Sequence, residues 1–228
     1  MNNFTLIIPS YNDYQYLPHI IKVAQKHPLI KQIILVDDAS NQISKEVFKN
    51  IPDITLLTHK SNKGKAQALK TGLSKASNQN IIFLDSDLIG LSQKHLSLLI
   101  NSYQENNRKP QIGIFDDSLV FRLIGWTAFF SGQRIYPKEF LDGNLQIFNN
   151  KGNISGYLIE TKSNQILFDS KTDFNLVRLK GLTQKQKISK VGLKGLISDL
   201  KVTNLVIRQI GLKNFLQSLS RLKTISAS

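Results

Sequence analysis

The chain has 228 residues, of which 41% are apolar and 20% charged, so it can build a full hydrophobic core and is not an intrinsically disordered protein. It contains no cysteine, which excludes disulfides, zinc–thiolate sites, iron–sulfur clusters and thiol nucleophiles. The formal charge of +14 is uneven, since residues 1–150 hold 16 basic and 12 acidic side chains and residues 151–228 hold 14 and 4.

Five short apolar runs alternate with segments of helical periodicity along the first half of the chain. The runs are rich in β-branched residues and lack polar alternation, which is typical of buried parallel strands. They are Phe4–Ile8, Ile33–Val36, Ile54–Thr58, Ile81–Leu84 and Ile112–Phe115. Helices are predicted between them and after the fourth run, where Ser92 can cap the helix start. This alternation predicts an α/β fold with a doubly wound, mostly parallel sheet and helices on both faces.

The pattern loosens after residue 111 and turns helical again beyond residue 181. Two apolar stripes, Leu193–Leu200 and Leu212–Leu219, are flanked by lysines at helical spacing. We therefore expect a domain over 1–180 and a basic, amphipathic helical extension over 181–228. The start of the chain lacks the basic and apolar regions of a signal peptide, and no apolar run approaches the roughly 20 residues that span a bilayer.

Polar and acidic residues follow three of the predicted strands. These are Pro9-Ser10-Tyr11-Asn12, Asp37-Asp38 and Asp85-Ser86-Asp87. Ligands of open α/β sheets bind beyond the carboxyl ends of the strands, so these residues predict the site. Two carboxylates two residues apart suit Mg²⁺ or Mn²⁺ shared with a phosphate group, although this motif taken by itself is better explained by a solvated turn.

A basic segment with a glycine, Asn62-Lys63-Gly64-Lys65, opens the third predicted helix. A helix N-terminus with basic side chains favours a diphosphate, and the alternative is an ordinary helix start. The segment lacks the spacing of a P-loop, and no Gly-x-Gly-x-x-Gly motif follows the first strand. ATPase and dinucleotide-binding functions are therefore disfavoured.

These motifs, in this order, resemble glycosyltransferase family 2, the GT-A nucleotide-sugar transferases, over about the first 110 residues. The segment Ser131–Arg134, with Gly156, Tyr157 and Glu160, looks like the acceptor half of the polyprenyl-phosphate (dolichol-phosphate) mannosyl- and glucosyltransferases. It is also similar, more loosely, to the glucosyl-3-phosphoglycerate synthase group. The resemblance implies a GT-A domain with a nucleotide-sugar half at 1–110 and an acceptor half at 111–180.

The resemblance also implies roles for single residues. A UDP- or GDP-sugar would lie against a set of nucleotide-sugar-binding residues: Pro9, Tyr11, Asp37, Asp38, Lys63, Gly64, Asp85 and Ser86. Asp85 and Asp87 would hold Mg²⁺ or Mn²⁺, with Asp87 the more direct contact and a catalytic residue. Some relatives add a histidine ligand, but the comparable stretch here, Gly181–Lys190, has Gln184 and no histidine.

The acceptor side offers two kinds of catalytic residue. A hydroxyl acceptor needs a general base, for which the candidates are Glu160, Asp116 and Asp117. A phosphate acceptor is already anionic and needs a cation to position it, and Arg134 is the candidate. For each of them an ordinary surface or ion-paired residue is the alternative, and the four histidines are predicted to be surface or packing residues.

The basic last third and the aromatic residues Trp126, Phe129 and Phe130 fit a lipid-phosphate acceptor approached from an anionic membrane, unless the aromatics are core. This favours a cytoplasmic enzyme of cell-envelope glycan biosynthesis, peripheral at the inner face of the membrane. A nucleotidyltransferase, or a non-catalytic domain that binds membranes or nucleic acid, is the alternative. Nucleic acid is not an expected partner, because residues 180–228 contain one aromatic, Phe215.

Overall fold

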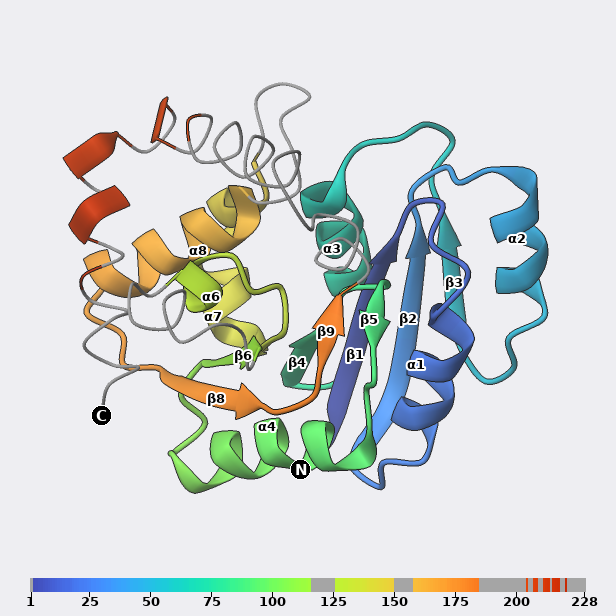
Figure 1. Ribbon diagram of the computed structural model, residues 1–228, viewed down its shortest axis with the longest axis horizontal. Helices are drawn as coiled ribbons and strands as arrows, with labels where there is room; N and C mark the ends of the chain where they lie inside the picture. The colour runs from blue at the N-terminus through green and yellow to red at the C-terminus, as the bar shows by residue number, and fades with distance from the viewer. Residues whose placement is uncertain are drawn as a thin grey trace.

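The computed structural model describes residues 2–115, 126–149 and 158–184, with scattered residues between 204 and 220. Within these residues the centre is a seven-stranded sheet of order β3-β2-β1-β4-β7-β6-β8 (Figure 1). Its strands are β1 (Phe4–Ser10), β2 (Ile30–Asp37), β3 (Thr55–Thr58), β4 (Asn80–Phe83), β6 (Gln111–Phe115), β7 (Arg134–Pro137) and β8 (Asn175–Leu179). A small antiparallel pair is formed by β5 (Leu88–Ile89) and β9 (Thr183–Gln184).

Helices connect most of these strands. They are α1 (Leu17–Gln25), α2 (Gln42–Lys49), α3 (Lys65–Leu73), α4 (Gln93–Glu105), α6 (Trp126–Phe129), α7 (Lys138–Asp142) and α8 (Leu158–Asp169). The five predicted strands and the four predicted helices are all present, and Ser92 is the N-cap of α4 as expected. The α/β class with a mostly parallel sheet is confirmed.

The sheet contains one antiparallel strand that the sequence did not predict. β7 pairs antiparallel with both β4 and β6, so β4 and β6 are parallel but not adjacent. Arg134 begins this strand and Pro137 ends it. A four-residue strand with an arginine and a proline lacks the continuous apolar run by which buried strands are recognised.

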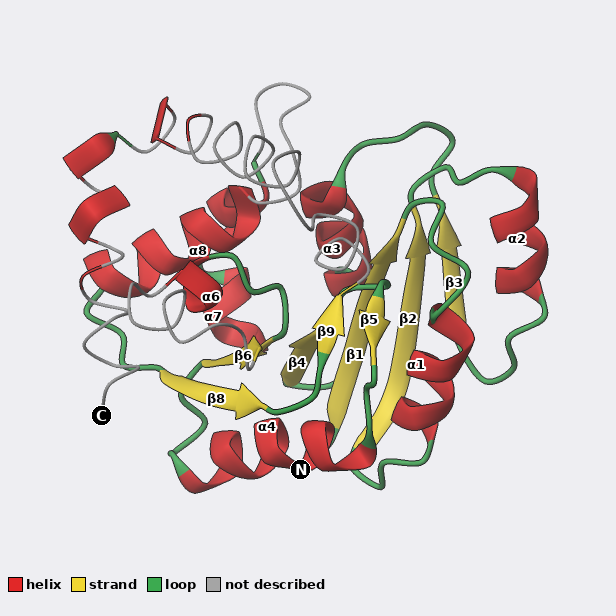
Figure 2. Cartoon of the chain, in the orientation of Figure 1, coloured by secondary structure: helices red, strands yellow, loops and turns green. Residues whose placement is uncertain are grey.

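Helices cover both faces of the sheet, in two separate layers of core residues (Figure 2). Successive residues of β1 alternate between the layers, with Leu6 and Ile8 facing α1, α2 and α4, and Ile7 facing α3 and the later helices. α3 packs especially close, because Gly72 leaves room for Ile7 and Val36 where a side chain would collide. The first turn of α3 is thereby held against the carboxyl ends of β1 and β2.

Several sequence expectations fall outside the described residues. These are the candidate bases Asp116 and Asp117, the pair Gly156 and Tyr157, the side chain of Trp126, and the stripe Leu193–Leu200. The division into 1–180 and 181–228 therefore stays a prediction. Within the described parts, no helix has the length and apolar character that a membrane span requires.

The aromatic residue Phe129 belongs to the core. Phe129 is fully buried and packs against Phe130 and Phe215, with ring centroids 4.8 and 5.2 Å away. Phe129 and Phe215 therefore belong to the hydrophobic core and are not available to a membrane surface, whereas the side chains of Leu212 and Leu216 are more than half exposed.

Candidate functional site

A cavity of about 320 Å³ opens beyond the carboxyl ends of β1, β2 and β4, at the first turn of α3. Its described lining includes four acidic side chains, Asp13, Asp38, Asp85 and Asp87, and a single cationic one, Lys65. The remaining lining residues are Pro9, Ser10, Tyr11, Asn62, Gly64, Ala68, Ser86, Phe130 and Gln184. The three strand-end motifs and the basic segment thus meet in one place, as the parallel strand ends led us to expect.

The wall formed by the ends of β1 and β2 is built from backbone and ring surface. Pro9 and Tyr11 line it, and Tyr11 is 50% exposed, so its ring can stack on a planar ligand. Asp37 is not part of the lining, because it is buried and its Oδ1 accepts the N–H of Ser40 at 2.8 Å. That contact stabilises the turn between β2 and α2, so Asp37 has a structural role and is not part of the cavity wall.

Asp38 holds the segment that leads into α3. Its Oδ1 accepts the backbone N–H of Lys63 at 2.8 Å, and its Oδ2 accepts that of Gly64 at 2.7 Å. Gly64 has φ +84°, a conformation that favours glycine, and it lines the cavity. The exposed Lys63 takes part here through its backbone and does not line the cavity.

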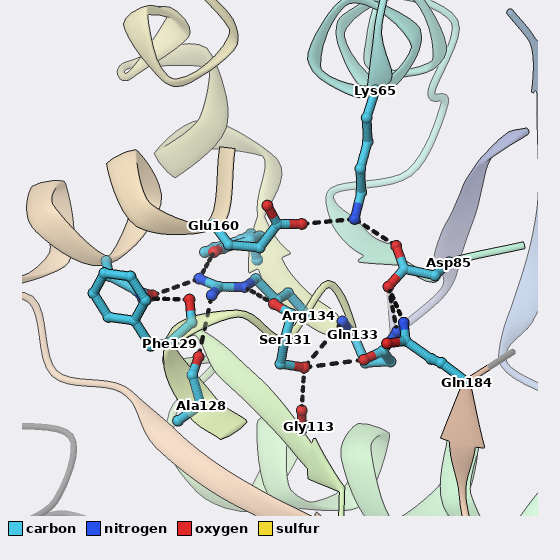
Figure 3. A network of polar contacts seen from close by, with 12 residues as sticks. Lys65, Asp85, Gly113, Ala128, Phe129, Ser131, Gln133, Arg134, Glu160 and Gln184 are labelled. Atoms are coloured by element: carbon cyan, nitrogen blue, oxygen red, sulfur yellow. Dashed lines mark hydrogen bonds and ion pairs between the residues drawn. The ribbon is translucent and has the colours of Figure 1, made fainter. Parts of the chain in front are cut away.

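Asp85 is the centre of a polar network that draws on distant parts of the chain (Figure 3). Its Oδ1 lies 2.5 Å from the Nζ of Lys65, and its Oδ2 accepts from the side-chain amides of Gln133 at 2.8 Å and Gln184 at 2.6 Å. Gly132 allows this approach, since a Cβ there would lie 2.5 Å from either carboxylate oxygen. Asp85 is therefore held in one orientation by three separate elements.

Lys65 also bridges to a second, fully buried carboxylate. Its Nζ lies 2.6 Å from Oε1 of Glu160 at the start of α8 (Figure 3). Burial alone would lower the pKa of Lys65, but the two carboxylates outweigh it and the pKa is raised, so the side chain stays an ammonium. Burial raises the pKa of Glu160, against the opposing effect of Lys65, and its Oε2 is buried with no hydrogen-bond partner among the described residues.

Arg134 lies behind the cavity and not in its lining. It is 2% exposed, and its guanidinium donates to the carbonyl of Ser131, the Tyr136 hydroxyl and the Asn164 side chain. The sequence placed Arg134 in an accessible acceptor loop, whereas the structure makes it part of the buried support of β7. Its donors are already used inside the protein, and the basic side chain in the described lining of the cavity is that of Lys65.

Asp87 and Ser86 complete the wall after β4. Both are largely buried, and the Ser86 hydroxyl donates to Oδ2 of Asp13 at 3.3 Å, so a third carboxylate stands near the motif. Among the described residues no three acidic, histidine or cysteine side chains are grouped closely enough to hold a metal ion by themselves. The oxygen donors present still fit Mg²⁺ or Mn²⁺, since such ions commonly take one or two carboxylates and complete their shell with phosphate and water.

Four residues of the site were missed or undervalued at the sequence level. Lys65 was quoted only as a part of the basic segment, Gln133 only as a part of the acceptor loop, and Gln184 only as the residue in place of a histidine. His59 was expected to be a surface or packing residue, and it is buried; its hydrogen bond to Asp38 was not expected. Each of these residues has polar neighbours in the sequence, and its partners lie far along the chain, so no local pattern distinguishes it.

Comparison with known proteins agrees with this geometry. The model of the family described as glycosyl transferase family 2 matches residues 5–158. The chain is 29% identical to the glycosyltransferase GlyG of Streptococcus pneumoniae over 171 residues, which are 69% of this chain and 54% of the relative. It is 24% identical to the 4,4'-diaponeurosporenoate glycosyltransferase of Staphylococcus aureus over 132 residues, 56% of this chain and 35% of the relative. The chain thus spans about a third to a half of the length of these curated relatives.

The fold is similar to that of solved glycosyltransferases. A crystal structure of glucosyl-3-phosphoglycerate synthase from Mycobacterium tuberculosis, with Mn²⁺, UDP-glucose and phosphoglyceric acid, superposes with a TM-score of 0.68. The match covers 92% of this chain and 80% of that one, at 15% sequence identity. At this identity the match establishes the GT-A fold and leaves the ligands as properties of the relative.

Proposed function

Because the chain belongs to glycosyl transferase family 2, we propose that it transfers a sugar from a nucleotide-diphosphate sugar to an acceptor in the cavity at the carboxyl ends of β1, β2 and β4. The solved relative with this fold binds UDP-glucose, which supports a UDP-sugar donor, and a GDP-sugar is the alternative. The exposed ring of Tyr11 and the surface of Pro9 are the proposed platform for the nucleoside.

The observation that carries this proposal is the charge of the cavity. Four carboxylates face one ammonium among its described lining residues, so a diphosphate with two or three negative charges would be repelled if it entered alone. A divalent cation that enters with the diphosphate removes this repulsion. The cavity therefore suits a metal–nucleotide complex and not a free anion.

Asp87 and Asp85 are the residues that we propose to hold Mg²⁺ or Mn²⁺, and the solved relatives contain these ions together with UDP or UDP-glucose. When bound, the cation would offset the charge that develops on the leaving diphosphate. Lys65 keeps its ammonium beside Asp85 and supplies a second, fixed positive charge at the same place. Gln133 and Gln184 orient the Asp85 carboxylate, and Gly132 leaves the space for it.

The acceptor is proposed to be a phosphorylated compound, either small or a lipid phosphate. The relative that was solved with phosphoglyceric acid supports the small acceptor, and the charge of residues 151–228 supports a lipid at an anionic surface. For a hydroxyl group on such an acceptor, Glu160 stays the proposed general base, although it is 2% exposed and is linked to the cavity lining only through its ion pair with Lys65. Its Oε2 has no partner among the described residues, and a raised pKa makes its carboxylate a stronger base.

The proposal is tested by thermal unfolding with UDP, GDP, ADP and CMP, each with and without Mn²⁺. A nucleotide at 100 times its dissociation constant stabilises the folded state by about 2.7 kcal/mol, which shifts the unfolding midpoint measurably. We expect UDP or GDP to stabilise the protein only when Mn²⁺ is present. Comparison with ADP and CMP shows whether the stabilisation requires a particular base and a diphosphate.

The Asp87→Asn variant should lose this response, because its amide is a weaker metal ligand of the same shape. Asp142→Asn is the matched control, since Asp142 is an exposed acid that pairs with Lys138 away from the cavity. The proposal would be wrong if no nucleotide stabilised the wild-type protein, or if Asp87→Asn responded like Asp142→Asn.

A further inference from the structure

His59 is a buried polar residue directly beside the proposed nucleotide site. It follows β3 and is 8% exposed, and its backbone N–H donates to the carbonyl of Asp37 at 2.8 Å. That bond extends the β2–β3 pairing by one residue and fixes the place of the histidine backbone. The direction of the His59 side chain is therefore determined by the pairing of two strands and not by a loop.

Both ring nitrogens of His59 have partners on different elements. Nδ1 lies 2.6 Å from Oδ1 of Asp38, and Nε2 lies 2.9 Å from the hydroxyl of Thr71 on α3. As a carboxylate, Asp38 can only accept, so Nδ1 carries the hydrogen and Nε2 can accept from Thr71. The ring thus connects the end of β2 to the middle of α3.

The Asp38 carboxylate in turn determines the position of the cavity wall. Its two oxygens accept the backbone N–H groups of Lys63 and Gly64, just before α3 begins. Without His59, Oδ1 would lose a donor in a place where water cannot freely replace it, and the carboxylate could rotate. The backbone at Gly64, which lines the cavity, would then lose its fixed position.

We propose that His59 is a positioning residue for nucleotide binding, which acts by holding the Asp38 carboxylate and through it the backbone of residues 63 and 64. The inference rests on the proposed function, because it assigns the nucleotide to the cavity that this backbone lines. In this proposal His59 does not itself contact the nucleotide, since it is not part of the described lining of the cavity.

The test compares two amide variants that differ in which bond they keep. In His59→Asn the amide nitrogen occupies the place of Nδ1 and keeps the bond to Asp38. In His59→Gln it occupies the place of Nε2, where it donates to the Thr71 hydroxyl and no longer reaches Asp38. We expect the dissociation constant of UDP or GDP with Mn²⁺, measured by titration calorimetry, to rise about tenfold in His59→Gln and to stay within about threefold in His59→Asn.

His27→Asn is the matched control. His27 is 6% exposed and also has partners at both ring nitrogens, Leu29 and Ser97, but it lies at the opposite end of the sheet, before β2. Its replacement should leave nucleotide affinity unchanged even if it lowers stability. Thr71→Val, which removes the other partner of His59, should weaken binding less than His59→Gln does.

The outcomes separate the two proposals. If the wild-type protein binds neither UDP nor GDP with Mn²⁺, the proposed function is overturned and this inference falls with it. If the wild-type protein binds and His59→Gln binds equally well, only the inference is overturned. The inference would also be overturned if His59→Gln, His59→Asn and His27→Asn all weakened nucleotide binding equally, because that result would indicate general destabilisation of the protein.

Discussion

Within the Asp85-Ser86-Asp87 motif, Asp85 is already part of a network of polar side chains. Asp85 already accepts from Lys65, Gln133 and Gln184, so a cation that binds it must share these donors or displace one. Replacing Asp85 would therefore break up the contacts of Lys65, Gln133 and Gln184 as well as remove a metal ligand. Asp87 also lines the cavity, and we expect its replacement to abolish the metal-dependent response.

A pH dependence of stability is expected from His27. Burial lowers its pKa below the ordinary value of about 6.5, so the unfolded chain binds a proton more readily than the folded protein does. The free energy of unfolding therefore contains a contribution that is present above about pH 6.5 and is lost as the pH falls below it. In urea titrations between pH 7.5 and 5, His27→Asn should lose less stability than the wild-type protein. An identical pH slope in the two proteins would contradict this.

At the element scale, α3 is the helix that builds the site. Lys65 is its first residue, and Gly64 directly precedes it; both line the cavity. Near the other end of the helix, Gly72 packs against Ile7 of β1 and Val36 of β2. The helix can bring its first turn to the strand ends because Gly72 allows its backbone to approach Ile7 and Val36 closely. Packing at one end of this helix thus controls the geometry of the cavity at the other.

Gly72→Ala should destabilise the protein despite the better helix propensity of alanine. The gain in propensity is about 1 kcal/mol, but the new Cβ overlaps Ile7, a stiff β-branched residue on a central strand, and such overpacking typically costs about 1–3 kcal/mol. We expect a net loss of up to about 2 kcal/mol in urea unfolding. Lys70→Ala, in the same helix, is the control and should change stability by under about 0.5 kcal/mol. A Gly72→Ala protein as stable as the wild type would refute the packing argument.

At the scale of the whole molecule, charge and apolar exposure coincide in the last third of the chain. Residues 151–228 have 14 basic and 4 acidic side chains, and Leu212 and Leu216, four residues apart, are 56% and 54% exposed. The buried Phe215 between them attaches this segment to Phe129. Exposed leucines among basic residues suit a surface of anionic lipid.

Vesicle sedimentation tests this association. The protein should bind vesicles that contain anionic lipid more strongly than neutral ones, and added salt should weaken the binding because it screens the charges. Replacing Leu212 and Leu216 together by serine should reduce binding to anionic vesicles several-fold. Ile43→Ser, which removes a similarly exposed residue from α2, should not. Equal binding to neutral and anionic vesicles would leave the lipid acceptor without support.

The α/β class, five of the seven strands in the sheet and the location of the site could be predicted from the sequence. Apolar runs without alternation predicted the strands, helical periodicity predicted the connections, and the ends of parallel strands meet at one edge for any sequence that folds in this way. Pro9, Tyr11, Asp38, Gly64, Asp85 and Asp87 were therefore predicted to converge before any contact between them was known, and they line one cavity.

The pairing of polar groups in the cavity could not be predicted, because it depends on contacts between distant parts of the chain. Lys65 and Glu160 are 95 positions apart, and Asp85 and Gln184 are 99 positions apart, so no local pattern contains these contacts. For the same reason the sequence did not show that β7 buries Arg134, or that the buried His59 is hydrogen-bonded to Asp38. Periodicity records which face of an element is apolar, whereas the partner of a buried polar group depends on how whole elements pack together.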